Sequence, residues 1–251
     1  MIKAEALTLK RNGNTILQNF NFSWDKGEKI VLLGPNGSGK TTLALGLAGI
    51  IPPSSGSIFI DSKNILEYDL KSLRKKIGIV FQDPETQFVT TNVEREISFG
   101  LSNIKEDKKE IKEKVHSIIK DFNLEFLLEK DPLSLSAGEK QIVAIASVYS
   151  MEPEYIIFDE VTSFLDRKWK EKIYEIWEKS YSSLLIITQN FKEINFGERV
   201  VFLENGKITF NGSASILERI FHFSYDSSFF RLLEENKEKI SQYEKIIEVF
   251  K

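Results

Sequence analysis

The feature that most constrains this chain is a glycine-rich segment placed between an apolar run and a helix. Residues 30–33 are uninterrupted apolar residues, which is typical of a strand buried on both faces of a sheet. Residues 34–41 then read GPNGSGKT, and residues 42–49 have a helical pattern. This order points several backbone N–H groups and the positive end of the helix toward one place. We therefore expect a phosphate group to bind in the loop.

The loop matches the pattern G-x-x-x-x-G-K-[ST], which assigns a part to each side chain. Lys40 would reach the β- and γ-phosphates of a nucleotide, and the Thr41 hydroxyl would be one magnesium ligand. Further contacts to ATP are expected from Asn36, Gly37, Ser38, Gly39 and Thr42. The sequence thus predicts ATP and Mg²⁺ as cofactors. A glycine turn with an accidental lysine is the alternative, and the flanking strand and helix argue against it.

A second buried strand ends in two acidic residues. Residues 155–158 are apolar, and Asp159 and Glu160 follow directly. Open α/β sheets bind their ligands at the carboxyl ends of the strands, which places both carboxylates near the expected phosphate. Asp159 would hold magnesium, and Glu160 would act as the general base that polarises the attacking water. Acids also occur here simply because a strand meets solvent, so the glycine loop is what favours the catalytic interpretation.

Composition argues against several classes of function. The chain has 251 residues and a formal net charge of -3, so no overall positive field favours nucleic acid as a partner. It contains no cysteine, which excludes disulfides, thiol nucleophiles and zinc–thiolate sites and fits a reducing compartment. We expect no secretory leader at residues 1–5, and no apolar run approaches the roughly 20 residues that span a bilayer. Any membrane role would therefore depend on a partner.

The remaining pattern predicts an α/β chain with a helical block in its middle. Further strands are expected at residues 2–9, 18–24, 57–61, 77–81, 184–188, 200–204 and 207–210. The last two would form a hairpin across Asn205 and Gly206. Helices are expected within residues 105–129, 137–149 and 168–180. Beyond about residue 213 we expect helices with an aromatic cluster packed on the core, rather than on a second subunit: Phe221, Phe223, Tyr225, Phe229 and Phe230.

Residues 135–141, LSAGEKQ, resemble the signature loop of ABC-type ATPases, usually written LSGGQ. The glycine loop, Gln82, this signature, the acid strand and the segment SFLD at 163–166 occur in that family's order. The resemblance covers about residues 2–212. The chain is thus similar to the ATP-binding subunits of ABC transporters, and is identified as an ATPase on these motifs.

The resemblance implies a fold and a division of the chain. The fold class is α/β, a P-loop NTPase of the ABC type, with a RecA-like core, an N-terminal antiparallel β-subdomain and an inserted α-helical subdomain. The ATPase domain would span residues 1–213 with the helical subdomain at about 83–150, and residues 214–251 would form a C-terminal helical extension. Residues 77–87 and 92–100 look most like the ATPases of energy-coupling-factor transporters, which import vitamins and transition-metal ions.

The signature implies a second subunit. Ser136 and the N–H of Gly138 lie at the expected start of a helix, where they would form a second anion site. A chain that binds one nucleotide in its glycine loop needs only one such site. In the family, two subunits pack head to tail, and each signature closes on the γ-phosphate held by the other chain. The resemblance therefore implies that Ser136, Ala137, Gly138 and Glu139 act on the partner's ATP.

Further roles and partners follow from the same resemblance. Gln82 would ligate magnesium, and Asp166 would carry communication between the two sites. Residues 81–99 would dock the coupling helices of a transmembrane partner. The implied partners are a second ABC ATPase, identical or not, a transmembrane coupling subunit and a substrate-binding membrane subunit, with no nucleic acid. The chain would lie at the cytoplasmic face of the cell membrane as a peripheral protein.

This sequence departs from the family where a histidine usually contacts the γ-phosphate. Residues 184–190 read LLIITQN, so Gln189 stands at that position as a candidate catalytic residue beside Glu160 and Lys40. The chain's two histidines, His116 and His222, lie elsewhere, and we expect them to be structural or solvated. An amide donates a hydrogen bond but carries no charge, so transition-state stabilisation would fall. We expect a slow or asymmetric site.

Two smaller departures concern the base and the signature. The family stacks adenine on an aromatic residue beyond the first strand, and here Arg11 stands near that position. Its planar guanidinium either stacks on the base or is simply solvated in the turn. Ala137 replaces the usual glycine and Glu139 the usual glutamine. Glu139 adds a negative charge close to a phosphate site, which would weaken closure of the pair.

Two other interpretations stay open. The first is a degenerate half-site that holds ATP as glue for the dimer while the partner turns over; Gln189 favours it and the intact Glu160 argues against it. The second is a soluble ABC protein of DNA repair or translation. Repair members carry a long coiled-coil insertion and translation members two cassettes, and neither fits 251 residues. The transported substrate is not encoded here, because the membrane subunits select it.

Overall fold

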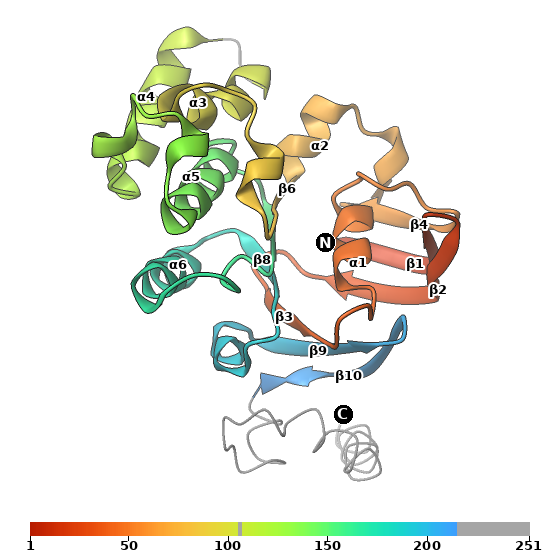
Figure 1. The fold of residues 1–251 in the computed structure, drawn as a ribbon. Helices are drawn as coiled ribbons and strands as arrows, with labels where there is room; N and C mark the ends of the chain where they lie inside the picture. Colours follow the sequence, from red (N-terminus) through yellow and green to blue (C-terminus); the bar gives the residue numbers. More distant parts are fainter. Residues whose placement is uncertain (105–106, 215–251) are drawn as a thin grey trace.

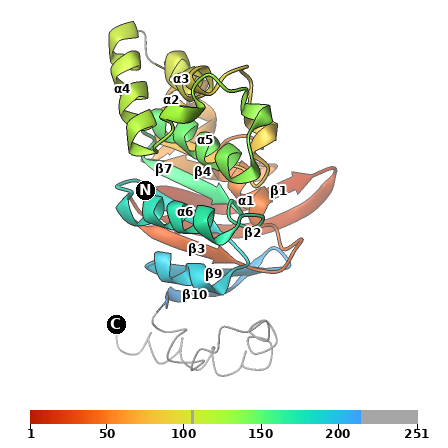
Figure 2. The ribbon, with the colours of Figure 1, turned by 60° about the vertical axis from the view of Figure 1, so that its left-hand side comes forward.

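The structure is a computed structural model that describes residues 1–104 and 107–214. A six-stranded sheet lies at its centre, and a four-stranded sheet packs beside it (Figure 1). Three helices between residues 93 and 150 gather beyond one edge of the central sheet (Figures 1 and 2). The architecture is therefore α/β with a separate helical part, as predicted from the motifs.

The central sheet is parallel except at one edge. Its order is β10-β9-β3-β8-β7-β6, in which only β10 runs antiparallel to its neighbour. Its strands are β3 (Lys29–Leu33), β6 (Ile77–Val80), β7 (Tyr155–Asp159), β8 (Ser183–Ile187), β9 (Arg199–Glu204) and β10 (Lys207–Ser213). Asn205 and Gly206 join β9 to β10 with positive φ at both residues, as a two-residue hairpin of this kind requires. Every strand predicted for this sheet is present.

The four-stranded sheet is antiparallel and is built from the N-terminal part of the chain. Its order is β2-β1-β4-β5, with β1 (Ile2–Arg11), β2 (Asn14–Trp24), β4 (Ser55–Ile60) and β5 (Lys63–Asn64). Buried and exposed residues alternate from Asn19 to Trp24 in β2, because successive side chains of a strand point to opposite faces. The hairpin pairs right up to its turn, so β1 and β2 extend beyond the predicted ranges and bring Arg11 to the hairpin tip.

The α-helices of the described residues are α1 (Lys40–Leu47), α2 (Leu70–Lys76), α3 (Val93–Ile104), α4 (Lys108–Asp121), α5 (Ala137–Ser150) and α6 (Arg167–Lys179). Helices α4, α5 and α6 lie where helical patterns were predicted. Helix α1 begins two residues before the predicted 42–49, directly at the lysine of the glycine loop. Helices α2 and α3 were not predicted as helices. The seven residues of α2, with three basic ones in the last turn, present too short an apolar pattern. Helix α3 ends where the predicted helical block at 105–129 begins, although it lies inside the helical subdomain expected at about 83–150.

Two hydrophobic cores lie on the two faces of the central sheet. Along β3, Val31 and Leu33 face the core shared with helices α3 to α6, and Ile30 and Leu32 face the core shared with α1 and the antiparallel sheet. The same alternation continues in β7 and β8. Because both faces are covered, the open places of the sheet are the ends of its strands. Functional side chains can gather there.

No helix among the described residues is long and apolar enough to cross a membrane. His116 is exposed on α4, as expected for a solvated histidine. The predicted C-terminal extension, with its aromatic cluster and His222, lies outside the described residues except for residue 214. The structure therefore leaves the prediction of core packing by that cluster as it stood.

Candidate functional site

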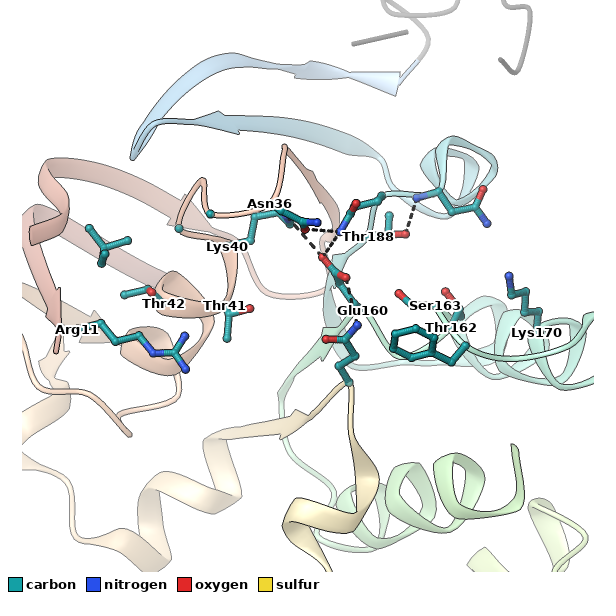
Figure 3. Close-up of a pocket in the computed structure, with 17 residues that line it drawn as sticks. Arg11, Asn36, Lys40, Thr41, Thr42, Glu160, Thr162, Ser163, Lys170 and Thr188 are labelled. Carbon is teal, nitrogen blue, oxygen red and sulfur yellow. Dashed lines mark hydrogen bonds and ion pairs between the residues drawn. The ribbon is translucent and has the colours of Figure 1, made fainter. Parts of the chain in front are cut away.

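A cavity of about 760 Å³ opens at the carboxyl ends of the central strands (Figure 3). Figure 3 shows Arg11 at one end, Lys40 and Glu160 in the middle, and Lys170 at the other end. The predicted site residues that line the cavity are Arg11, Asn36, Gly37, Gly39, Lys40, Thr41, Thr42, Gln82, Glu160 and Gln189. They come from segments far apart in the chain, at the end of β1 and directly after β3, β6, β7 and β8. The topology thus gathers them as the sequence predicted.

The glycine loop holds Lys40 in a buried position. The side chain of Lys40 is only 5% exposed, and its Nζ donates to the carbonyl oxygens of Gly34 at 2.9 Å and Pro35 at 3.1 Å. Gly39 begins α1 with φ of 109°, a conformation that side chains disfavour, so a glycine is required there. Thr41 and Thr42 follow in the first turn of α1 and line the cavity. The cation and the helix start therefore share one small space.

Glu160 lies at the centre of the cavity in an unusual backbone conformation. Its φ is 50°, in the left-handed region that few residues other than glycine adopt. Its N–H donates to the Ile187 carbonyl at 3.0 Å, and its own carbonyl accepts from the Ser163 N–H at 3.1 Å. Its Oε1 is 3.6 Å from Lys40 Nζ. The strained residue thus aims its carboxylate across the cavity at the lysine.

Gln189 occupies the position between the glycine loop and Glu160. Its Nε2 donates to Asn36 Oδ1 at 2.8 Å and to Glu160 Oε1 at 2.9 Å. On the other side of the carboxylate, Gln82 Nε2 lies 3.5 Å from Glu160 Oε2, at the long limit of a hydrogen bond. Two amides therefore flank the predicted general base, and one of them reaches the loop that would hold the phosphates.

Asp159 sits behind the cavity rather than on its wall. It is 4% exposed, and its Oδ1 has no hydrogen-bond partner among the described residues. Burial, and next the charge of Glu160, raise the pKa of Asp159 above its ordinary value, whereas the Thr41 hydroxyl lowers it. A buried carboxylate with an unused oxygen fits a cation ligand, because a cation would offset the cost of burying the charge. Asp159 and Thr41 therefore fit a magnesium site, and Gln82 lines the neighbouring wall.

At the other end of the cavity, Arg11 and Ile16 come from the two strands of the first hairpin. Arg11 is exposed, and Ile16 is half-buried beside it. Ile16 was not predicted. The signal that could have found it is its place shortly after the Asn12–Gly13 turn, on the strand that pairs with the end of β1. An apolar side chain next to a planar guanidinium makes this end suitable for a flat ring. The structure keeps the stacking prediction for Arg11 open.

The signature segment lies outside this cavity. Ser136 and Ala137 are exposed, and among the described residues neither lines the space around Lys40. Ser136 caps the start of α5 with a capping box. Its N–H and its hydroxyl donate to Glu139 Oε2 at 2.9 and 2.7 Å, and the Glu139 N–H donates to the Ser136 hydroxyl oxygen. The Ser136 hydroxyl bond holds the pKa of Glu139 below its ordinary value. A carboxylate of this chain thus already accepts both donors of Ser136, one of the two residues of the predicted anion site.

Gly138 and Asp166 connect the signature to the rest of the molecule. A Cβ built on Gly138 would collide with the indole of Trp169, so only glycine lets α5 approach α6 at this point. Asp166 begins α6, where its Oδ1 accepts the Trp169 N–H at 3.1 Å. Asp166 therefore has a structural use as a helix cap, whatever its part in a dimer.

Ser38 does not contribute its side chain to the cavity. It is buried, its Oγ has no hydrogen-bond partner among the described residues, and its carbonyl accepts the Gly206 N–H at 3.0 Å. The far end of the cavity instead contains residues that were not predicted: Thr162, Ser163, Phe164, Lys170, Thr188 and Asn190. The order along the chain offered a signal, since most of them follow directly on Glu160 or flank Gln189.

Comparison with known proteins places this geometry in a family. Residues 17–163 match the model of the ABC transporter family. An ATP-binding cassette solved as a dimer in a post-hydrolysis state with ADP and Pi superposes with a TM-score of 0.78 at 26% identity, over 85% of this chain and 99% of that one. The fold and the site thus define an ATPase of the ABC type, and the predicted fold class is confirmed.

Curated relatives refine this result. EcfA1 of Mesomycoplasma hyopneumoniae, an energy-coupling factor transporter ATP-binding protein, is 38% identical over 224 residues, which are 86% of this chain and 82% of the relative. EcfA1 of Fusobacterium nucleatum is 39% identical over 219 residues, with coverages of 85% and 82%. The structure of cbiO1 from Clostridium perfringens, described as part of the ABC transporter complex cbiONQ, gives a TM-score of 0.75 at 30% identity over 98% of each chain. The chain belongs to the energy-coupling factor transporter ATP-binding proteins of the ABC transporter family.

Proposed function

We propose that this chain binds magnesium and ATP in the cavity and that its ATP hydrolysis powers uptake of a vitamin or a metal ion through membrane partners. The observation that carries the chemistry is the meeting of Lys40, Glu160 and Gln189 at one point, where the distances from Glu160 Oε1 are 3.6 and 2.9 Å. The similarity to energy-coupling factor ATP-binding proteins and to cbiO1 supports the transport role.

Each residue then has a part in the reaction. The backbone of residues 36–39 and the start of α1 hold the phosphates, and Lys40 exchanges its two carbonyl partners for phosphate oxygens. Glu160 accepts the proton of the attacking water, and its backbone conformation directs the carboxylate at that water. Gln189 donates to the γ-phosphate or to Glu160 and thereby keeps the two groups aligned. Arg11 and Ile16 bind the adenine.

Asp159, Thr41 and Gln82 are the residues that would hold magnesium. The unused Oδ1 and the buried charge of Asp159 support this assignment. When bound, magnesium neutralises negative charge on the phosphate oxygens during transfer of the γ-phosphoryl group.

The assembly we propose contains a second ATPase and membrane subunits. Ser136 is exposed and lies outside the cavity, which supports its action on nucleotide held by another chain, with Asp166 near the contact between the two. Val89 and Phe99 are large apolar side chains that are 63% and 46% exposed. Buried Glu96 fixes the Val89 segment, since its Oε2 accepts the N–H groups of Val89 at 3.1 Å and Thr90 at 2.8 Å. An exposed apolar surface whose backbone is fixed in this way is suited to bind a transmembrane coupling subunit at the cytoplasmic face.

Affinity purification of a tagged chain from membranes tests the assembly, and ATP turnover of the purified complex tests the chemistry. We expect at least one transmembrane protein and an ATPase to co-purify. Glu160→Gln should remove a distinct share of the turnover, and Lys40→Ala should remove ATP binding to this chain. Recovery of the tagged chain without membrane proteins, with full turnover of the Glu160→Gln form, would contradict the proposal.

A second candidate function is favoured by Gln189. A neutral amide stands where charge would stabilise the transition state, so the chain would hold ATP as dimer glue while its partner turns over. The same Glu160→Gln variant separates the two functions, because unchanged turnover of the assembled complex favours the glue role. Loss of turnover favours the catalytic one.

A further inference from the structure

A buried polar cluster lies beside the cavity and connects the two loops that carry Glu160 and Gln189. Its centre is Glu193, which lies in the short helix η5 (Phe191–Phe196) and is 0% exposed. One oxygen, Oε1, accepts three hydrogen bonds from side chains of three different segments. A fully buried carboxylate costs much free energy unless several donors compensate it. Such a group in this place calls for an explanation beyond packing.

The three donors show what the carboxylate holds together. Thr162 Oγ1 donates at 2.7 Å, Tyr174 OH at 2.9 Å and Asn190 Nδ2 at 3.1 Å. Thr162 lies two residues after Glu160, Asn190 directly follows Gln189, and Tyr174 belongs to α6. Burial, and next the charge of Glu193, raise the pKa of Tyr174, which keeps its hydroxyl protonated as a donor. The carboxylate therefore ties both loops to each other and to a helix.

The site needs such a tie, because the geometry of Glu160 is strained. Its φ of 50° is costly, and such a conformation persists only when its surroundings determine it. The Glu160 carboxylate also depends on the loop after β8, through the 2.9 Å bond from Gln189 Nε2. A shift of either loop would lengthen this bond and turn the carboxylate away from the lysine.

We propose that Glu193 is a positioning residue for ATP hydrolysis, in which its buried carboxylate fixes the Glu160 loop against the Gln189 loop through Thr162 and Asn190. Glu193 itself does not line the cavity, so it would act through Thr162 and Asn190. The inference rests on the proposed roles of Glu160 and Gln189. It predicts a defect in the chemical step, with nucleotide binding preserved.

A matched pair of variants tests the inference in the purified transporter complex. Thr162→Val and Tyr174→Phe each delete one O–H donor to the same Glu193 oxygen, but only Thr162 lies on the Glu160 loop. Tyr174→Phe also deletes the acceptor of a long, 3.3 Å bond from Asn190 Nδ2, whereas the bond from Asn190 to Glu193 remains. We expect Thr162→Val to lower the kcat of this chain's share of turnover by about tenfold or more while KM stays within about twofold. Tyr174→Phe should keep kcat within about twofold of the parent, even if it lowers the melting temperature as much as Thr162→Val does.

The side chain of Glu193 supplies a rescue. Glu193→Gln keeps an acceptor oxygen for all three donors and should retain most of kcat, whereas Glu193→Met, of similar length, should lose it. Two results would overturn the positioning role. One is that Thr162→Val has the same kcat as the parent; the other is that Thr162→Val and Tyr174→Phe both lose kcat in proportion to their loss of melting temperature. Glu160→Gln in the same assay separates failure of this inference from failure of the proposed function. If Glu160→Gln turns over ATP normally, the proposed function is wrong. If Glu160→Gln is inactive while Thr162→Val is normal, only the role of Glu193 is wrong.

Discussion

At the scale of single residues, the site depends on charges that the fold has removed from water. Lys40 is buried and bonded to carbonyl oxygens, and Asp159 is buried with one oxygen unused. Burial raises the pKa of Asp159, so the charged form of this carboxyl group is disfavoured and a bound cation would gain more here than at the surface. The buried charge of Asp159 thus lowers the stability of the fold and strengthens the binding of a metal with nucleotide.

Asp159→Asn tests the cost of this buried carboxylate. The pKa of Asp159 is raised in the folded state, so the ionised form destabilises the fold at pH values above that raised pKa, and the cost disappears as the pH falls and the group becomes protonated. At pH 7 without magnesium we expect the variant to melt at a higher temperature than the parent. The increase in melting temperature that Mg²⁺ with ATP gives the parent should be much smaller in the variant.

The exposed Asp166 provides the control for that measurement. Asp166→Asn changes the same functional groups, and asparagine caps a helix about as well as aspartate. Its melting temperature should therefore change little, with the nucleotide effect retained. An Asp159→Asn chain that melts lower than the parent and still responds fully to magnesium and ATP would contradict the metal assignment.

At the scale of elements, the contact between α5 and α6 is set by one missing side chain. Gly138→Ala would push a methyl group into the Trp169 indole, so we expect the free energy of unfolding to fall by about 1–3 kcal/mol, measured by urea denaturation. Gly100→Ala in α3 is the control. There the new methyl group meets the flexible side chain of Met151, with Sδ at 2.7 Å, and alanine favours a helix by about 1 kcal/mol. An equal loss in both variants would contradict the role of Trp169.

The start of α5 should respond to acid. The pKa of Glu139 is lowered by its bond from the Ser136 hydroxyl, so the capping box stabilises the fold above the ordinary value of 4.5 and loses this effect as the pH falls through the lower folded-state pKa. The urea midpoint of Glu139→Gln should lie below that of the parent at pH 7 and approach it below pH 4.5. In a Ser136→Ala background, Glu139→Gln should lower the urea midpoint by less than it does in the parent. If the effects of the two substitutions on the midpoint simply add, the two side chains do not act together as a cap.

At the scale of the whole molecule, the two anion sites of one chain face different places. The glycine loop belongs to the cavity, whereas Ser136 is exposed outside it. Phe164, on the loop between β7 and α6, is 80% exposed. An aromatic side chain so exposed suits a surface that another subunit covers. Under the proposed function a complete site needs two chains, as in the proposed ATP-bound dimer.

Ser136→Arg separates the two anion sites. We expect ATP to bind this variant with the affinity of the parent, measured by titration with a fluorescent ATP analogue, because residue 136 does not line the cavity. ATP-dependent association with the second ATPase should be lost in sedimentation experiments, because the larger side chain would block closure. A loss of ATP affinity as large as the loss of association would show that the signature serves the chain's own nucleotide.

The resemblance to ABC-type ATPases predicted the fold class, and local patterns predicted most of the residues that line the cavity. Short apolar runs that end in GPNGSGKT or in Asp159 and Glu160 specify buried strands with functional ends, because few other structures accommodate such runs. Helices α4, α5 and α6 were predicted from their periodicity, whereas α3 was not, although its buried apolar residues have helical spacing. Helix α2, the partner role of Ile16 beside Arg11, and the exclusion of the Ser38 side chain were not predicted, since each depends on packing between distant segments.

The sequence by itself determined which chemical groups are present: a lysine and hydroxyls on a glycine loop, two carboxylates after a strand, and an amide in place of a histidine. Only the tertiary structure decided how those groups meet, with Gln189 bonded to both Asn36 and Glu160 and with Glu193 joining the loops behind them. The reason is physical. Local patterns set strand and loop, whereas the 2.9 Å bond between Gln189 and Glu160 depends on how the parallel strands β7 and β8 pair.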